Sequence, residues 1–376
     1  MNQFFKNISV LTIWIFSIFF TGFSSESDND SLTLILESAN HNENTFINGE
    51  LISILSGNVI FSYDDISIRS DEATWWRNDG IIRFQNNIKV LRGSQILECD
   101  KMHFTQKDNL LTASGNFHFK DTLEQTELSG KNAQYYVESR LFYLSGDPLL
   151  VRVDTVAAET LTISGIKMSY IDSIKCATVT DSVKITKGDL FSSCMFASYY
   201  TDSNYATLRT DPFVTYKSHK ITGDSIDLTF GKETLEKASI TGNSHGVYID
   251  TSDSENDTTF THIWGDSLFF SVSDSGQLDS IWAFGKALCK HFITTYPDRI
   301  NEASGKTMLL SFTQDSNVDN LKIWGNARST YHIEEDNNKG TNEVSGDSIT
   351  VYFNKGKASQ LTLDGSARGV YYPQNL

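Results

Sequence analysis

A four-residue phrase returns four times in the last part of this chain, about forty residues apart. It reads Gly-Asp-Ser-Ile, Gly-Asp-Ser-Leu, Gly-Lys-Thr-Met and Gly-Asp-Ser-Ile, beginning at Gly223, Gly265, Gly305 and Gly346. A second glycine follows each phrase after 19 or 20 residues, at Gly242, Gly285, Gly325 and Gly365. A fixed long period predicts a repeat architecture, in which each unit buries its apolar face against its neighbours. The recurrence also argues against a catalytic motif, since an active site is seldom built four times.

Residues on both sides of each glycine alternate between apolar and polar with the period of a β-strand. Each glycine therefore indicates a bend or bulge between two strand segments that share one face. The sixth residue after the second glycine is also related between copies, as Tyr248, His291, Tyr331 and Tyr371. Short polar segments, which predict hairpin loops, separate the halves at residues 231–233, 274–276, 315–317 and 354–356.

The first half of the chain carries the same pattern with a period of about 30 residues. Its bends are expected at Gly57, Asn86, Gly115, Gly146, Thr180 and Thr210. The sequence thus predicts an all-β fold, an elongated, repeat-built β-jelly roll of about ten two-strand units, in which two antiparallel sheets face each other across a slot. A propeller has a similar period, but its Trp-Asp and Gly-His signatures are missing.

The N-terminus predicts export. Lys6 precedes the uncharged apolar stretch Ile8–Thr21, which as a helix spans about 21 Å, less than a bilayer core. We predict a signal peptide over residues 1–24, with an uncleaved inner-membrane anchor as the alternative. A polar leader follows over residues 25–45. The jelly roll then divides into an N-terminal half, 46–220, and a C-terminal half, 221–376.

The formal net charge of −16 makes nucleic acid, whose phosphates it would repel, an unsuitable partner. The four cysteines form no Cys-x-x-Cys pair, and the eight histidines show no metal-ligand spacing, so we predict neither a metal site nor a cofactor. The cysteines lie in strand-like runs, which favours buried small hydrophobes, although disulfides stay open. The acidic runs 253–257, 315–319 and 334–338 are typical of solvated hairpin tips rather than Ca²⁺ sites.

Gly265–Leu268 also matches the nucleophile block of a family of serine esterases. Such enzymes need a later Asp-x-x-His, whereas the one such spacing here, at Asp100–His103, lies far upstream. We therefore interpret the Gly-Asp-Ser phrase as a turn, in which aspartate and serine bond to nearby backbone. We expect no catalytic residue.

Two strand-and-bend segments resemble the OstA-like lipopolysaccharide-transport family. They read Ser-Asp-Glu-Ala-Thr-Trp (70–75) with Asn-Ile-Lys-Val (87–90), and Cys-Asp-Lys-Met-His-Phe (99–104) with Ala-Ser-Gly-Asn-Phe-His-Phe (113–119). Further copies at 146–151 and 325–327 extend the resemblance over about residues 50–373. It implies a periplasmic or envelope protein with a slot-shaped β-jelly roll, whose apolar groove carries the acyl chains of lipopolysaccharide toward the outer membrane. The chain is longer than a single bridging module of that family, and we expect no membrane barrel after Leu376.

The apolar stripe inside the slot is the candidate lipid-binding site. Its residues are Ile88, Val90, Phe117, Phe119, Ile226, Leu228, Phe230, Leu268, Phe270, Met308, Leu310, Phe312, Ile323, Ala327, Ile349, Val351, Phe353, Leu363 and Ala367. Because an acyl methylene gains about 0.8 kcal/mol on burial, such a stripe could hold a lipid without catalysis. The alternative is a structural or adhesive envelope protein whose stripe is packed core.

The predicted partners follow from the resemblance and from the sheet edges. The ligand is lipopolysaccharide or a related glycolipid. Open edges at the ends of the sheets favour strand addition, so we expect contacts with an outer-membrane barrel, with an inner-membrane complex, or head to tail with another copy. The acidic net charge opposes a phosphorylated ligand, and Lys89, Arg92, Arg328 and Arg368 are candidates for a basic rim that softens this repulsion.

Overall fold

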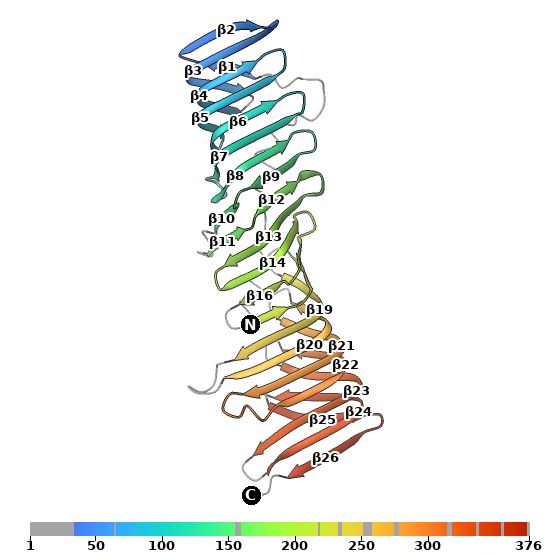
Figure 1. Ribbon diagram of the computed structural model, residues 1–376. Helices are drawn as coiled ribbons and strands as arrows, with labels where there is room; N and C mark the ends of the chain where they lie inside the picture. Colours follow the sequence, from blue (N-terminus) through green and yellow to red (C-terminus); the bar gives the residue numbers. More distant parts are fainter. Residues whose placement is uncertain are drawn as a thin grey trace. The chain divides into compact units, whose positions relative to one another are not determined.

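The structure, a computed structural model, describes residues 34–63, 65–154, 159–216, 219–231, 235–250, 258–273, 278–313, 318–335, 338–354 and 357–373 (Figure 1). The predicted signal peptide, its cleavage site and the start of the leader lie outside these residues, as do the tips of the four predicted hairpin loops. Contacts divide the chain into two compact units. The N-terminal unit comprises residues 34–188 and 196–203, and the C-terminal unit comprises residues 189–195 and 204–373.

The N-terminal unit is built from antiparallel strands and one short 3-10 helix, η1 (Asp172–Ile174). Its strands are β1 (Ile35–Ser38), β2 (His41–Ile47), β3 (Glu50–Tyr63), β4 (Ile66–Trp76), β5 (Ile81–Arg92), β6 (Gln95–Thr105), β7 (Leu110–Asp121), β8 (Thr126–Tyr136), β9 (Leu141–Ser145), β10 (Leu149–Asp154), β11 (Glu159–Ser164), β12 (Lys167–Ile171) and β13 (Cys176–Lys187). The last residues of β14 (Leu190–Tyr200) complete it.

The C-terminal unit holds the first residues of β14 and all later strands. These are β15 (Tyr205–Arg209), β16 (Phe213–Tyr216), β17 (His219–Thr222), β18 (Ser225–Phe230), β19 (Leu235–Asp250), β20 (Thr259–Val272), β21 (Leu278–Ile293), β22 (Asn301–Phe312), β23 (Val318–Glu335), β24 (Asn338–Asn354), β25 (Lys357–Asp364) and β26 (Arg368–Pro373). In both units each long strand pairs with the next along the chain, as β5 with β6 and β20 with β21. The predicted all-β class is confirmed. In the described part of the chain, no helix is long and apolar enough to span a membrane.

Each repeat contains a bend made of two consecutive residues with left-handed φ. Asn48-Gly49 is such a pair in the hairpin between β2 and β3, and ten such pairs occur at bends in the described residues. They are Gly57-Asn58, Asn86-Asn87, Gly115-Asn116, Gly146-Asp147, Asp181-Ser182, Thr210-Asp211, Gly242-Asn243, Gly285-Lys286, Gly325-Asn326 and Gly365-Ser366. Ten pairs match the predicted number of units. One bend differs by a residue from the sequence-based expectation, since Asp181 and not Thr180 takes the glycine position.

Where one strand runs through the bend, as in β5, the bend is a β-bulge that inserts one extra residue into that strand. Between the pairs Gln85↔Lys101 and Ile88↔Cys99, β5 contains two residues where β6 contains only Asp100. A bulge bends and twists the strand that carries it, so the two halves of one strand join different layers. Burial continues across the bend of β5, where Phe84 before it and Ile88 after it are both enclosed. The interior face is therefore shared by both halves, as the predicted jelly roll requires.

The residue opposite the bulge explains the aspartate of the repeated phrase. The Nδ2 of Asn116 donates a hydrogen bond to Oδ2 of Asp100 (2.9 Å), and a Cβ at Gly115 would lie 2.9 Å from the Asp100 Cβ. The same arrangement puts the Asp224 carboxylate over Gly242, and Asn243 Nδ2 donates to its Oδ1 (3.2 Å). Glycine is therefore favoured at the bulge for two reasons: it adopts the positive φ without strain, and it has no Cβ that would collide with the aspartate.

The turn interpretation is wrong for the copies of the phrase at Gly265, Gly305 and Gly346, which lie inside β20, β22 and β24. Gly265 lies in the middle of β20, and its φ is not left-handed. A Cβ there would lie 2.8 Å from the carbonyl oxygen of Ser267 and 3.0 Å from that of Phe284. This first glycine is required because the neighbouring strand's bulge approaches closely, a long-range constraint that a local turn motif does not contain.

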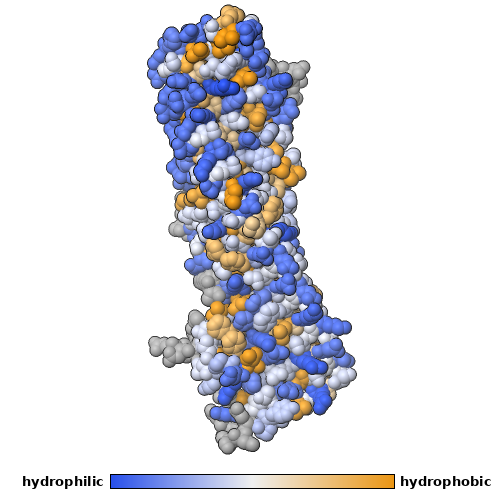
Figure 2. All heavy atoms as spheres, viewed as in Figure 1, coloured by the Kyte–Doolittle hydropathy of each residue, from blue (hydrophilic) through white to orange (hydrophobic). Residues whose placement is uncertain are grey.

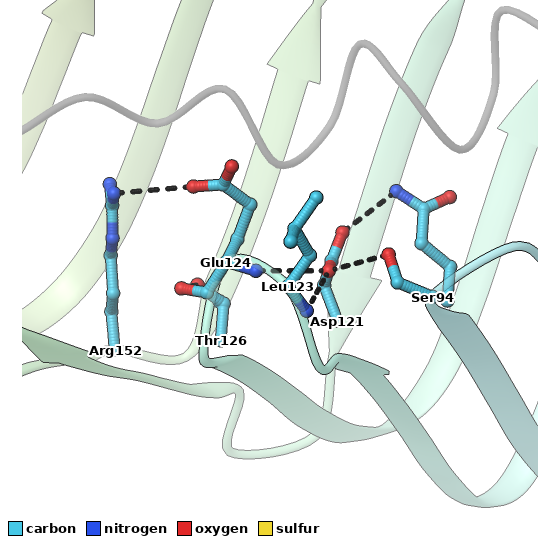
Figure 3. A network of polar contacts seen from close by, with 7 residues as sticks. Ser94, Asp121, Leu123, Glu124, Thr126 and Arg152 are labelled. Carbon is cyan, nitrogen blue, oxygen red and sulfur yellow. Dashed lines mark hydrogen bonds and ion pairs between the residues drawn. The ribbon is translucent and has the colours of Figure 1, made fainter. Parts of the chain in front are cut away.

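Polar side chains at the ends of hairpins form hydrogen bonds that hold the turns between strands. Asp121, at the end of β7, is buried and accepts hydrogen bonds from Ser94 Oγ (3.0 Å), Gln95 Nε2 (3.0 Å) and the backbone N–H groups of Leu123 (2.9 Å) and Glu124 (3.1 Å) (Figure 3). Burial alone would raise the pKa of Asp121, but these hydrogen bonds outweigh it and lower the pKa. The carboxylate therefore fixes the turn between β7 and β8.

Part of the predicted leader is also ordered as strands. β1 and β2 both pair antiparallel with β3, from Ile35↔Ser62 to Ile47↔Glu50. Almost every residue of β2 is exposed, including Phe46 and Ile47. Among the described strands, none pairs with the outer edge of β1 and β2 in the N-terminal unit or with that of β25 and β26, which both pair with β24, in the C-terminal unit.

Candidate functional site

The predicted lipid-binding stripe lies on the interior face of the two units. Fourteen of its nineteen residues are buried. The exceptions are Leu228, Phe312, Phe353 and Leu363, which are half-buried, and Ala367, which is exposed. In the C-terminal unit Leu268, Met308, Ile323, Ala327 and Ile349 have no exposed surface.

Two continuous rows of apolar side chains line the C-terminal interior, each made of residues opposite one another on successive strands. The first row is Ile226, Ile240, Leu268, Ala283, Met308, Ile323, Ile349 and Leu363. The second row is Leu228, Ala238, Phe270, Ile281, Leu310, Leu321, Val351 and Leu361. Residues opposite each other have Cβ atoms about 5 Å apart, so each row is a continuous apolar track along the repeats.

Small residues occupy the corner where the strands bend. Ser244 lies opposite Gly265, Ala287 opposite Gly305, and Ala327 opposite Gly346. A Cβ at Gly305 would lie 2.5 Å from Cγ2 of Ile323, so a larger residue there would push into the first apolar row. The alternation of alanine and glycine therefore keeps the two halves of each strand close and the interior narrow.

The interior opens at the last repeat. Leu361 is 39% exposed, and Ala367, which follows the last bulge, is exposed, whereas its repeat equivalent Ala327 is fully buried. Among the described strands, none beyond β25 and β26 covers this face. Ala327 and Ala367 are equivalent in sequence but lie in different surroundings.

In the N-terminal unit the interior is filled with aromatic and branched side chains. Phe61 and Phe84 meet edge to face with ring centroids 5.4 Å apart. Val90 lies opposite Leu97, which in turn lies opposite Phe119. All five are buried, so this interior is as apolar as that of the C-terminal unit.

Most charged residues are not buried, and the face drawn in Figure 2 is mainly hydrophilic with scattered apolar patches. Lys89 pairs with Glu98 across the strands (3.0 Å) and Arg92 with Asp65 (3.0 Å), so these two members of the predicted basic rim are engaged by carboxylates. Arg328 and Arg368 are exposed. The four residues come from both units and do not form one rim within either.

The serine, aspartate and histidine considered for catalysis lie in strands of different units. Ser267 lies in β20 between Thr241 and Phe284 of the neighbouring strands, whereas Asp100 and His103 belong to β6 of the N-terminal unit. The four cysteines are free and buried, as predicted for small hydrophobes, and burial raises the pKa of the Cys99 and Cys289 thiols to about 12. Within the described residues, no three His, Cys, Asp or Glu side chains gather as a metal-ligand set.

Comparison with known proteins identifies a family for the first part of the chain. Residues 38–170 match the profile of the LptA/(LptD N-terminal domain) LPS transport protein family. The segment contains the two motif pairs at 70–90 and 99–119 on which the resemblance was based. No curated protein matches the chain.

Among solved structures, similarity extends to LptH from Pseudomonas aeruginosa, described as the LptA-homologous periplasmic component of the conserved lipopolysaccharide transport device. The identity is 12% and the TM-score 0.26, over 28% of this chain and 76% of that one. The family match confirms the OstA-like resemblance over residues 38–170, which match the LptA and LptD N-terminal family of lipopolysaccharide-transport proteins.

Proposed function

We propose that this protein is a non-enzymatic carrier that binds lipopolysaccharide or a related glycolipid in the interior of its β-jelly roll. The observation that carries the proposal is the pair of unbroken apolar rows, each formed by one residue from every successive strand from β18 to β25. Together with the transport-family domain at residues 38–170, they favour a track along which acyl chains lie.

The energetics agree with binding without covalent chemistry. Each acyl methylene transferred from water to an apolar interior gains about 0.8 kcal/mol, so a few chains suffice for tight binding. A lipid chain in the interior would replace side-chain contacts there, whereas the strands are joined to one another by backbone hydrogen bonds. A lipid that replaces those contacts therefore leaves the strand ladders intact.

The free sheet edges are the proposed partner contacts. In the N-terminal unit the edge is formed by β1 and β2, where Phe46 is 73% exposed, and in the C-terminal unit by β25 and β26, where Tyr372 is 52% exposed. Such edges accept an additional strand through backbone hydrogen bonds. We assign them to envelope transport components, an outer-membrane barrel and an inner-membrane complex, or to a second copy of this chain.

The proposed location is the periplasm or cell envelope, reached by the N-terminal signal peptide predicted over residues 1–24. Edman sequencing of the protein from cells should begin near Ser25. Protein with an intact Met1 in the membrane fraction would instead indicate an uncleaved inner-membrane anchor.

One observation favours a second candidate, a structural envelope protein with a packed core. Leu268, Met308 and Ile323 have no exposed surface, which is typical of ordinary core residues. The carrier and the structural protein differ in whether the interior opens to admit an acyl chain.

The test is the lipid content of the full-length protein purified from its native envelope with mild detergent. Mass spectrometry of an organic extract should find acylated glycolipid in a fixed ratio to protein, and the ratio should fall when Leu310 is replaced by Asp. A control variant, Leu309→Asp, changes the neighbouring residue on the outer face. Absence of any bound glycolipid from the wild-type protein would favour the structural candidate.

A further inference from the structure

The interior face of the C-terminal unit changes its chemistry at one edge. Beyond the bulges the interior begins with buried residues, among them Ile263, Cys289, Ala303 and Val344. Two residues further along each strand, on the same face, stands a polar or aromatic side chain. These residues, the polar edge row, are His219, Tyr248, Thr261, His291, Asn301, Tyr331, Asn342 and Tyr371.

Strand register joins the members of this row in two stretches. Tyr248 lies opposite Thr261, Thr261 opposite His291, and His291 opposite Asn301. The row resumes with Tyr331 opposite Asn342, and Asn342 opposite Tyr371. The repeat alignment had singled out the four residues six positions after the second glycine, and the structure shows which residues lie between them.

Contacts within the row hold its side chains in place. The rings of His219 and Tyr248 stack with centroids 4.6 Å apart, and the backbone N–H of Ile249 donates to Nδ1 of His219 (3.2 Å). Thr261 Oγ1 and His291 Nδ1 are 2.9 Å apart and share a hydrogen bond. The row is thus a pre-arranged series of hydroxyl, imidazole and amide groups.

Similar contacts continue toward the last strands. Asn301 Oδ1 accepts a hydrogen bond from the backbone N–H of His332 (2.9 Å), and the Tyr371 hydroxyl donates to the carbonyl of Lys339 (3.2 Å). Tyr331 is 37% exposed and Tyr371 is 42% exposed, so these aromatic faces are accessible to a ligand.

The opposite edge of the same interior is apolar. There the hairpins close with the pairs Phe230↔Leu235, Val272↔Leu278 and Phe312↔Val318. Phe230, Leu235 and Leu278 are buried. The two edges therefore differ in kind, and an amphiphile lying in the interior can place its polar end at one edge only.

The side chains of the polar edge row determine which kind of polar headgroup they can bind. Its members carry no formal charge apart from the two histidines, and burial lowers the pKa of His291, which keeps that ring neutral near pH 7. The chain carries a net charge of −16, so anionic groups gain nothing from its overall field. Tyrosine faces and neutral amide and hydroxyl groups instead suit a ring with apolar C–H faces and many hydroxyls.

We propose that the polar edge row binds the sugar rings of a glycolipid headgroup whose acyl chains lie on the buried residues beside the row, among them Ile263, Cys289, Ala303 and Val344. This inference rests on the proposed carrier function and adds the class of headgroup and the residues that recognise it. Two residues of extended strand separate these buried residues from the row, which corresponds to about 7 Å, so a headgroup bonded directly to acyl chains at these residues reaches the row.

The test compares two lipids that differ in the sugar. One is lipid A, an acylated and phosphorylated glucosamine disaccharide, and the other is phosphatidic acid, a phosphorylated diacyl lipid that has no sugar. Their affinities are measured on the full chain by displacement of a fluorescent fatty acid. The variants are Tyr331→Ala and Asn342→Ala in the row, with Tyr331→Phe to remove the hydroxyl alone. Tyr352→Ala, a 40% exposed tyrosine of β24 on the outer face, is the matched control.

Wild-type protein should bind lipid A more tightly than phosphatidic acid. Each row-to-alanine variant should weaken lipid A binding by about tenfold, the effect of one or two lost hydrogen bonds, and leave phosphatidic acid unchanged. Tyr352→Ala should alter neither affinity. Equal binding of both lipids by the wild type, or lipid A binding that survives both row substitutions, would overturn this inference alone. Failure of the wild type to bind either lipid would overturn the carrier function as well.

Discussion

Gly242 offers a quantitative test of how the bends are built. Its φ of +71° costs a residue with a side chain about 1–2 kcal/mol. In addition, an alanine Cβ would lie 2.5 Å from Cγ and 2.8 Å from Cβ of Asp224. Overpacking of this kind costs about 1–3 kcal/mol. Gly242→Ala should therefore lower the free energy of unfolding of the C-terminal unit by about 2–5 kcal/mol.

A double-mutant cycle with Asp224→Gly separates the two contributions, because it removes every side-chain atom that the new methyl group meets. In that background Gly242→Ala should cost only the backbone term of about 1–2 kcal/mol, which gives a coupling of about 1–3 kcal/mol. Gly49→Ala is the control, since Gly49 has a φ of +84° and no atom within 4 Å of a built Cβ. The assay is urea unfolding followed by circular dichroism. Additive effects of the two substitutions would refute the close approach of Asp224 to the bulge.

Three further predictions concern other parts of the chain. Ala327→Asp buries a carboxylate without a partner and should lower the free energy of unfolding by about 3 kcal/mol or more in urea melts. Ala367→Asp, at an exposed position, should change the free energy of unfolding by less than about 0.5 kcal/mol. Similar losses for both variants would contradict the exposure of the last repeat. Asp121→Asn should destabilise the N-terminal unit by about 1–2 kcal/mol at pH 7. Because the pKa of Asp121 in the folded protein lies below 3.8, its contribution to stability is present above pH 3.8 and is lost as the pH falls through the folded pKa. The free energies of unfolding of the wild type and of Asp121→Asn should therefore become equal as the pH is lowered. Iodoacetamide at pH 8 should leave Cys99 and Cys289 unlabelled in the native protein and label them in urea, and rapid native labelling would contradict their burial.

Much of the architecture can be predicted from sequence because the repeat is short and its bends need special residues. Glycine or asparagine recurs where φ must be positive, and this alone located Gly57, Gly115 and Gly242. The interior stripe followed from period-two alternation. Even Thr210, which lacks the usual bend chemistry, was found because its spacing matched its neighbours.

Other features depend on long-range contacts that the local sequence does not contain. The first glycine of each phrase resembles a turn residue, yet Gly265 is required by the approach of Phe284 from the next strand. β2 has almost no buried residue, so no apolar alternation marked His41–Ile47 as a strand. The polar edge row could be seen only in part, because Thr261, Asn301 and Asn342 join Tyr248, His291 and Tyr331 through strand register alone.

The most direct test of the carrier function is photo-crosslinking from adjacent leucines of β22. Leu310 lies in the second apolar row and is buried, whereas Leu309 is half-buried on the outer face of the same strand. A photoreactive phenylalanine analogue is introduced at each position in the full chain, and cells are irradiated. We predict a lipopolysaccharide adduct from position 310 and none from position 309. Equal crosslinking from both positions, or none from 310 in a folded protein, would contradict a lipid path between the two layers.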